Sequence, residues 1–302
     1  MSIFSKSAPK ASAPTRAPSA DEPYPGADLS PAQQRALDDL RMRGIAVMPF
    51  AELIDDDELW RELEADMADY VERAKRLAPK LLPRLTRPRN KDQFLVRRWG
   101  GMVNDPPVAS DGPWIRYAAS DALLNVVNTY RGVYTKLVGL DNVYTVPFKH
   151  SSTRVASQAW HRDPEDAHVV KCFLYFSNVD DDSGPFEYIP GSAPGGPYGD
   201  LWPWGTTWPG PDGREQRWYP PEGELEAKVP EQDRWRLTGA PGTLILCETS
   251  GFHRGGFSKS KPRAMSVQTY ISPSAEWKSV SFELDRRGEE GLSQQARYAI
   301  AT

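Results

Sequence analysis

Apolar positions in the first half of the chain recur at helical spacing. Four of them follow one another at intervals of three and four residues, with charges between, and predict a long helix over 55–77. They are Leu59, Leu63, Met67 and Tyr70. Ser30 is a favoured N-cap and Pro31 a favoured first helical residue, so another helix is expected to begin there. The same spacing predicts a third helix over 120–138.

The pattern changes near residue 142, where short β-rich runs alternate with Gly and Pro. The runs are 143–148, 154–160, 168–176, 186–192, 242–248 and 264–272. One more apolar run, 44–50, predicts a strand within the first half. Short strands at this density, with turn signals between them, are typical of a sandwich, barrel or jelly roll.

These patterns divide the 302 residues into an arm and one large domain. Residues 1–27 are rich in Ser, Ala and Pro and are expected to form a flexible arm. The single domain, 28–302, has a helical first part, 28–140, and a β core, 141–273. An insertion rich in Trp, Pro and Gly, 190–231, is too long for a simple connection. It is either a lid over a site or a packed surface segment.

Composition excludes several classes of partner. The formal net charge is −4, with no basic stripe to neutralise phosphates, so nucleic acid is not expected. No apolar stretch approaches the roughly 20 residues that cross a bilayer, and the first residues lack the apolar core of a secretory signal. The two cysteines, Cys172 and Cys247, lie in apolar runs. We expect them to be reduced core residues of a cytoplasmic protein.

The strongest chemical signal is the sequence His161-Arg162-Asp163. If this segment is a strand, residues two apart point to the same face, so His161 and Asp163 can reach one point. His253 follows the predicted strand 242–248 among glycines and is the third expected ligand. Two imidazoles and one carboxylate leave coordination positions open, an arrangement suited to non-haem Fe(II) oxygenases.

Three polar residues are candidates for binding a keto-acid beside such a metal. Arg263, ten residues after His253, offers a planar fork for a far carboxylate. Lys171 lies in an apolar run and either helps bind the keto-acid or extends to solvent from a strand face. Gln158 either faces the pocket near His161 or lies on a half-exposed strand.

The remaining residues near this motif have other interpretations. A kinase catalytic loop also contains His-Arg-Asp, but the fifth residue after Asp163 is His168 rather than Asn, and no Gly-rich phosphate loop precedes it. His168 and His150 are expected to be structural or surface groups. In a strand, Trp160 points to the face opposite that of His161, so it is expected to pack in the core.

The second half resembles the phytanoyl-CoA dioxygenase family of Fe(II)/2-oxoglutarate oxygenases, from about residue 144 to 272. Six features appear in the family's order, and each is weak alone. They are His161 with Asp163, Val179-Asp180, Gly184-Pro185 with Pro190-Gly191-Ser192, Gly242-Thr243, His253 and Arg263. Many relatives have His directly after the Pro-Gly-Ser segment, where this chain has Ala193. That position does not bind iron, and we expect the change to affect the loop over the pocket.

The resemblance implies a double-stranded β-helix, that is, a cupin-like jelly roll, mainly β with flanking helices. It also implies Fe(II) held by His161, Asp163 and His253, with 2-oxoglutarate and O2 converted to succinate and CO2 while a substrate is oxidised. Related halogenases have a small residue in place of the carboxylate, so Asp163 favours hydroxylation or another oxidation. The expected partner is a small or medium organic molecule.

Two other functions remain open from the sequence. One is a cupin-like isomerase or a Zn-dependent hydrolase, which keeps the metal and abandons the keto-acid. The other is a non-catalytic relative that binds a ligand. Neither the substrate nor the oligomeric state can be predicted from the residues.

Overall fold

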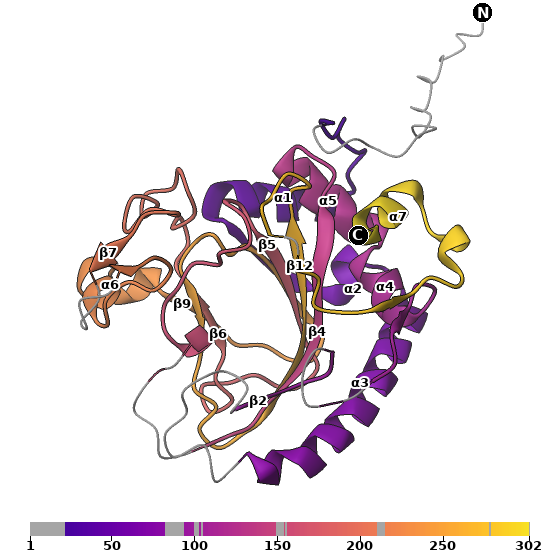
Figure 1. Ribbon diagram of the computed structural model, residues 1–302, viewed down its shortest axis with the longest axis horizontal. Coiled ribbons are helices and arrows are strands. Elements are labelled where there is room, and N and C mark those ends of the chain that lie inside the picture. Colours follow the sequence, from indigo (N-terminus) through magenta and orange to yellow (C-terminus); the bar gives the residue numbers. More distant parts are fainter. Residues whose placement is uncertain are drawn as a thin grey trace, which may run out of the picture.

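The computed structural model of the chain describes residues 22–81, 94–99, 103, 105–148, 154, 156–209, 215–277 and 279–301. Residues 1–21 of the predicted arm, 1–27, therefore lie outside the described residues. In its described end, 22–27, the Tyr24 amide donates to the Gly132 oxygen at 2.9 Å, and its ring contacts that of Tyr134. Within the described residues, no helix is long and apolar enough to cross a membrane. Three layers are visible in Figure 1: a group of helices, a large sheet and a small sheet.

The helices lie mainly on the outer face of the large sheet (Figure 1). They are α1 (Pro31–Arg43), α2 (Phe50–Leu53), α3 (Asp57–Leu77), α4 (Pro113–Ala118), α5 (Asp121–Arg131), α6 (Glu224–Lys228) and α7 (Gln294–Ile300). The predicted start of α1 is confirmed, because Ser30 caps it in a capping box and Pro31 is its first residue. The helix ends where Gly44 adopts the left-handed conformation, with φ 74°. The predicted apolar face of α3 is also confirmed, since Leu59, Leu63, Met67 and Tyr70 are all buried.

The strands form one six-stranded sheet and three smaller ones. The large sheet has the order β1-β10-β5-β12-β4-β2, and the small facing sheet the order β11-β6-β9. Their bounds are β1 (Ile45–Pro49), β2 (Leu95–Arg97), β4 (Lys136–Thr145), β5 (Val170–Tyr175), β6 (Phe186–Tyr188), β9 (Trp235–Leu237), β10 (Thr243–Glu248), β11 (His253–Gly255) and β12 (Arg263–Ile271). Two-stranded pairs join β3 (Val108–Ala109) to β13 (Leu284–Asp285) and β7 (Trp208–Pro209) to β8 (Glu215–Gln216).

Two predictions about the first half need correction. The helix predicted over 120–138 ends at Arg131, because Gly132 adopts a left-handed cap with φ 70°, and β4 begins at Lys136. The region predicted as the helical first part also supplies β2, a strand that the sequence pattern did not predict. The strand predicted over 44–50 is confirmed as β1, which joins the large sheet. The apolar residues Leu137 and Val138 continue the helical spacing by chance but belong to β4.

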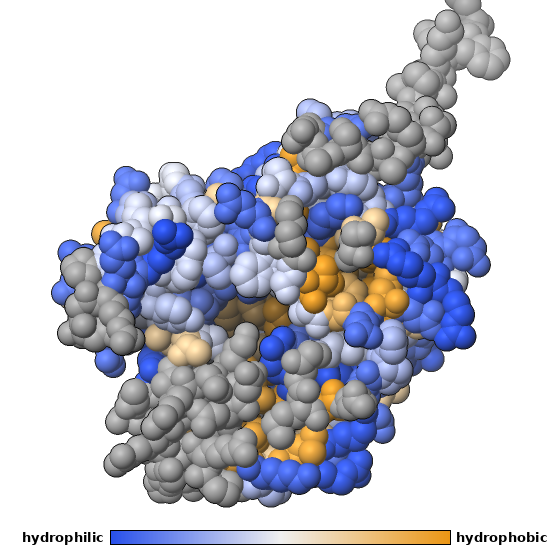
Figure 2. All heavy atoms as spheres, in the orientation of Figure 1, coloured by the Kyte–Doolittle hydropathy of each residue, from blue (hydrophilic) through white to orange (hydrophobic). Residues whose placement is uncertain are grey.

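Two apolar layers enclose the large sheet. The larger layer lies between this sheet and the helices, and the smaller lies between the two facing sheets. Phe173 and Tyr175 of β5 meet Phe186 and Tyr188 of β6 in the smaller layer. Cys172 and Cys247 are both buried and free, as predicted. The apolar filling between the sheets occupies only part of their width, and the rest is the hollow seen in Figure 2.

Candidate metal centre

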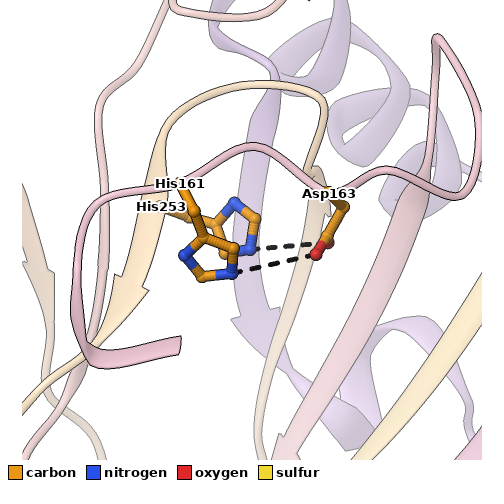
Figure 3. A group of neighbouring side chains, drawn as sticks. All are labelled: His161, Asp163 and His253. Carbon is orange, nitrogen blue, oxygen red and sulfur yellow. Dashed lines mark ion pairs between the residues drawn. The ribbon is translucent and has the colours of Figure 1, made fainter. Parts of the chain in front are cut away.

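Three buried side chains meet at the inner wall of this hollow. One ligand atom each of His161, Asp163 and His253 lies within 4.8 Å of the other two. Nε2 of His161 is 3.8 Å from Oδ1 of Asp163, and Nε2 of His253 is 3.4 Å from its Oδ2. Figure 3 shows the two imidazole rings side by side, both facing the carboxylate. Two imidazoles and one carboxylate at this spacing can hold a metal ion.

The backbone brings these residues together in a way that differs from the predicted strand. The segment 160–163 belongs to none of the named strands, and only His161 forms a bridge, antiparallel to His253. The two residues exchange backbone hydrogen bonds of 3.0 and 3.1 Å, and the Asp163 amide donates to the Thr249 carbonyl at 2.9 Å. The prediction that 154–160 is a strand is therefore wrong, since 156–158 form a 3₁₀ turn. Register with β11, rather than strand alternation alone, sets the ligand positions.

The imidazole rings are oriented by carbonyl oxygens. Nδ1 of His161 lies 2.9 Å from the Ala159 oxygen, and Nδ1 of His253 lies 3.0 Å from the Gly251 oxygen. A carbonyl only accepts, so each Nδ1 carries a proton, and Nε2 is the atom of each ring that can bind a metal. Burial, together with the neighbouring His253, lowers the pKa of His161 to about 3. His161 is therefore neutral at physiological pH, the form that binds metals.

Asp163 lies between these rings and a buried lysine. Nζ of Lys171 is 2.7 Å from Oδ2 of Asp163 and 3.5 Å from Oε1 of Glu165. Burial alone would raise the pKa of Asp163, but Lys171 and His253 hold it well below its ordinary value. Burial would lower the pKa of Lys171, but Asp163 and Glu165 raise it instead. The interpretation of Lys171 as a lysine reaching solvent from a strand face is therefore wrong, because its ammonium group pairs beside the histidines.

The hollow is a cavity of about 670 Å³ between the sheets. Its wall includes the three metal-site residues, the intervening Arg162, and also Gln158, Lys171 and Arg263. Arg263 is opposite Thr145 in the sheet register, whereas Lys171 is opposite Thr269. Six residues separate these two levels on β12, roughly 20 Å of strand. The backbones of Arg263 and Lys171 therefore lie at different levels of the cavity wall. The Arg263 side chain nevertheless reaches toward the histidines, because its Nη2 lies 3.8 Å from the place of a Cβ on Gly255, two residues after His253.

Arg263 is a buried cation without a buried anion. Within the described residues it forms no ion pair; it donates to the Gly184 carbonyl oxygen, and its Nε makes no hydrogen bond. Burial lowers the pKa of its guanidinium. An unbalanced charge of this kind is costly unless an anion joins it, so this end of the cavity is suited to a carboxylate.

Gln158 is the second polar group left without partners in the cavity wall. Its side chain is 1% exposed, and neither amide atom makes a hydrogen bond in the described chain. The alternative of a half-exposed strand position is therefore wrong. A buried amide in this state can bind a polar ligand group.

The structure adds residues that the sequence motifs did not indicate. The ring of Tyr219 stacks on His161, with centroids 5.3 Å apart, and Trp218 also lines the cavity. Both belong to the 190–231 insertion, which thus supplies part of the cavity wall. Nothing in the sequence separates these two aromatics from the other Trp and Tyr residues of that segment. Arg97 and Asp141 form an ion pair on the wall. The sequence does not indicate this pair either, because only strand register brings the two residues together.

The remaining predicted residues lie outside the cavity wall. His168 is partly exposed, and its Nδ1 contacts Glu248 at 2.5 Å. Trp160 packs in an apolar cluster with Ile189, Leu225 and Phe252, which confirms its predicted core role. His150 lies outside the described residues.

Comparison with solved structures shows the fold of the chain. No protein-family model matches it, and no curated protein matches its sequence. Among the solved structures it is similar to the epimerase SnoN in complex with Fe3+, alpha-ketoglutarate and nogalamycin RO. That likeness has a TM-score of 0.50 and 16% identity, over 82% of this chain and 86% of the other.

EctD from S. alaskensis with bound Fe is similar to the same degree. Its TM-score is 0.50 at 16% identity, over 85% of this chain and 83% of the other. The chain therefore shares its fold with two proteins, one solved with Fe3+ and alpha-ketoglutarate and the other with Fe. At this level of identity the likeness reaches no further than the fold.

Proposed function

We propose that this chain is an Fe(II)/2-oxoglutarate-dependent oxygenase that hydroxylates a small or medium organic substrate. Its fold would be a double-stranded β-helix, and its family that of phytanoyl-CoA dioxygenase. One observation carries the proposal: the His161, Asp163 and His253 cluster shares a cavity with Arg263, a buried cation that pairs with no carboxylate of the described chain. A metal face and an anion anchor in one cavity match the needs of a keto-acid that chelates iron.

The donor set fits Fe(II). Two neutral imidazoles and one ionised carboxylate are the ligands of non-haem Fe(II) oxygenases, and they leave positions for other ligands. Both Nε2 atoms face the carboxylate, so no side chain has to rotate far to coordinate an ion. When bound, iron and 2-oxoglutarate supply the oxidising chemistry, in which O2 and the keto-acid become succinate and CO2 as the substrate is oxidised.

The chain's own residues supply binding, orientation and exclusion of water. Arg263 would bind the far carboxylate of 2-oxoglutarate, and Gln158 would donate to or accept from the same ligand. Tyr219 covers one face of His161 and limits the access of water to the metal. Lys171 and the Arg97–Asp141 pair also line the wall, where their charges would favour a substrate with polar groups.

An anaerobic titration tests this function. Apo-protein receives Fe(II), then 2-oxoglutarate, while visible absorption is recorded. We expect a weak charge-transfer band only when both are present. A folded protein that gives no band with both would overturn the assignment. Product analysis after O2 is admitted then separates hydroxylation from epimerisation or another oxidation, by whether the product gains one oxygen atom.

A further inference from the structure

The histidine pair has a back side as well as a cavity side. His161 and His253 face each other in an antiparallel bridge, and the side chains that flank them meet in pairs across it. There the guanidinium carbon of Arg254 lies 4.2 Å from the ring centre of Trp160. The guanidinium carbon of Arg162 lies 3.9 Å from the ring centre of Phe252. Two reciprocal cation–π pairs thus bracket the histidines.

The two arginines are held in different ways. Arg254 pairs with two carboxylates, Glu187 at 2.7 Å and Glu226 at 2.9 Å. Arg162 forms no ion pair with any described residue and is 0% exposed. Its guanidinium instead donates to five backbone carbonyl oxygens. The acceptors are Trp202 at 3.0 Å, Ser192 at 2.6 Å, Gly199 at 3.1 Å, Leu201 at 3.0 Å, and Ser250.

These acceptors belong to two segments that surround the metal site. Ser250 lies in the turn whose Thr249 oxygen accepts from the Asp163 amide and whose Gly251 oxygen faces Nδ1 of His253. The other four lie in the 190–231 insertion. That insertion also accepts the Arg162 backbone amide at the Trp218 oxygen, 3.0 Å away, and donates from Trp204 to the Asp163 oxygen at 2.9 Å.

A fully buried cation without a counter-ion is costly, so stability alone does not account for it. An apolar residue of similar size would avoid the desolvation, but it would leave five carbonyl oxygens without these donors. The five hydrogen bonds hold the turn before His253 and the insertion in one fixed relation to Asp163. Only the planar, five-donor guanidinium can do this from one point.

We propose that Arg162 is a positioning residue of the metal centre, fastening the 249–251 turn and the insertion behind His161, Asp163 and His253. The inference rests on the proposed metal site. Partners that orient metal ligands from behind typically change metal affinity by about 10–100-fold when removed. We therefore expect substitution of Arg162 to weaken metal binding more than an equally destabilising substitution elsewhere in the protein.

The test uses Co(II) as a spectroscopic probe with the full-length protein. Arg162→Lys keeps the charge and removes the fork. We expect its Co(II) dissociation constant to rise about tenfold, with a changed d–d absorption spectrum. Leu63→Ala in α3, buried far along the chain from the site, is the matched control. It is expected to lower Tm by a similar amount and to leave Co(II) affinity and spectrum unchanged.

The outcomes separate the inference from the proposed function. Wild-type affinity and spectrum in a folded Arg162→Lys variant overturn the positioning role, and so does an equal loss of affinity in Leu63→Ala. If Arg162→Lys does not fold, Phe252→Leu removes only the ring beneath the guanidinium. A several-fold weaker Co(II) affinity in Phe252→Leu supports the role, and an unchanged affinity overturns it. Wild-type protein that binds neither Co(II) nor Fe(II) would instead refute the metal site itself.

Discussion

Buried polar groups on the cavity side of the His161–His253 bridge differ in their hydrogen bonding from those on its back side. On the cavity side, Arg263 Nε and both amide atoms of Gln158 make no hydrogen bond within the described chain. On the back side, Arg162 donates to five carbonyl oxygens and Arg254 to two carboxylates. Both sides are buried to a similar degree, so exposure does not explain the contrast.

The contrast separates ligand-binding groups from structural ones. A buried polar atom without a partner costs about 1–3 kcal/mol, and the fold keeps it only where something else recovers the loss. On the cavity side a ligand can recover it. On the back side Arg162 and Arg254 already have protein partners, so we expect these two residues to fix the geometry of the site. The predictions below test this division, beginning with the metal-site residues between the two sides.

The largest effect is expected from removing a histidine. His161→Ala or His253→Ala should weaken Fe(II) or Co(II) binding by more than about 100-fold. Losing a metal ligand costs more affinity than losing a residue that only orients a ligand, which costs about 10–100-fold. Turnover should be abolished. Calorimetric titration measures the affinity, and circular dichroism checks the fold. His168→Ala is the matched control, since His168 lies off the cavity, and it should bind metal normally. Full succinate formation by either site variant would contradict the assignment.

Arg263→Ala is expected to have the next largest effect. Removing a buried partner of a bound carboxylate costs roughly 2–5 kcal/mol, so 2-oxoglutarate binding should weaken at least about 30-fold. Binding of Fe(II) alone should not change, since Arg263 contacts none of the three metal-site residues. Arg263→Lys keeps the positive charge but not the planar fork, so its 2-oxoglutarate affinity should lie between those of wild type and Arg263→Ala. Equal 2-oxoglutarate affinity in wild type and Arg263→Ala would place the anion anchor elsewhere.

Local sequence signals predicted the elements that depend on neighbouring residues. Ser30 and Pro31 set the predicted start of α1, and the apolar spacing of α3 is confirmed residue by residue. The helix over 120–138 was predicted too long, because Gly132 was not weighed as a stop against the apolar residues of β4 beyond it. Helix caps and regular apolar spacing can be predicted from neighbouring residues. Where a helix is followed by an apolar strand, as at the end of α5, the apolar pattern alone does not locate the boundary.

The site was predictable where residue type limits the choice. The chain has only four histidines, and His161, Asp163 and His253 do lie together, although the segment before Asp163 is not the strand that the prediction assumed. Arg162 gave no signal, because its five acceptors are backbone carbonyls scattered over 192–250. The sequence left two roles open for Lys171 for a similar reason, since its pairing with Asp163 depends on a contact outside the sheet register.

Gln158→Leu should separate stability from binding. Its amide makes no protein hydrogen bond, so a residue of similar size should raise the free energy of unfolding by about 1 kcal/mol. Binding of 2-oxoglutarate should weaken roughly 2–10-fold, the worth of one neutral hydrogen bond. Asn128→Leu is the contrast, because Asn128 accepts from Thr135 at 2.7 and 2.9 Å and should lose stability. Similar destabilisation by both changes would mean that Gln158 belongs with the satisfied groups.

The smallest effect concerns Glu248, a satisfied carboxylate just before the 249–251 turn. Burial would raise its pKa, but hydrogen bonds from His168, Tyr130 and Ser250 lower it below the ordinary 4.5. Because the folded pKa is the lower one, the stabilisation is complete above pH 4.5 and is lost as pH falls through the folded value.

Glu248→Gln removes this titration. Between about pH 5 and 3, its free energy of unfolding should fall less steeply than that of wild type, by at most about 1.4 kcal/mol per pH unit. Glu64→Gln, on the exposed face of α3, makes the same charge change away from these hydrogen bonds and is the matched control. Denaturant titrations at successive pH values measure both slopes. If the Glu248→Gln curve runs parallel to the wild-type curve, the hydrogen bonds around Glu248 do not hold its charged form, and the back side is less completely paired than its contacts indicate.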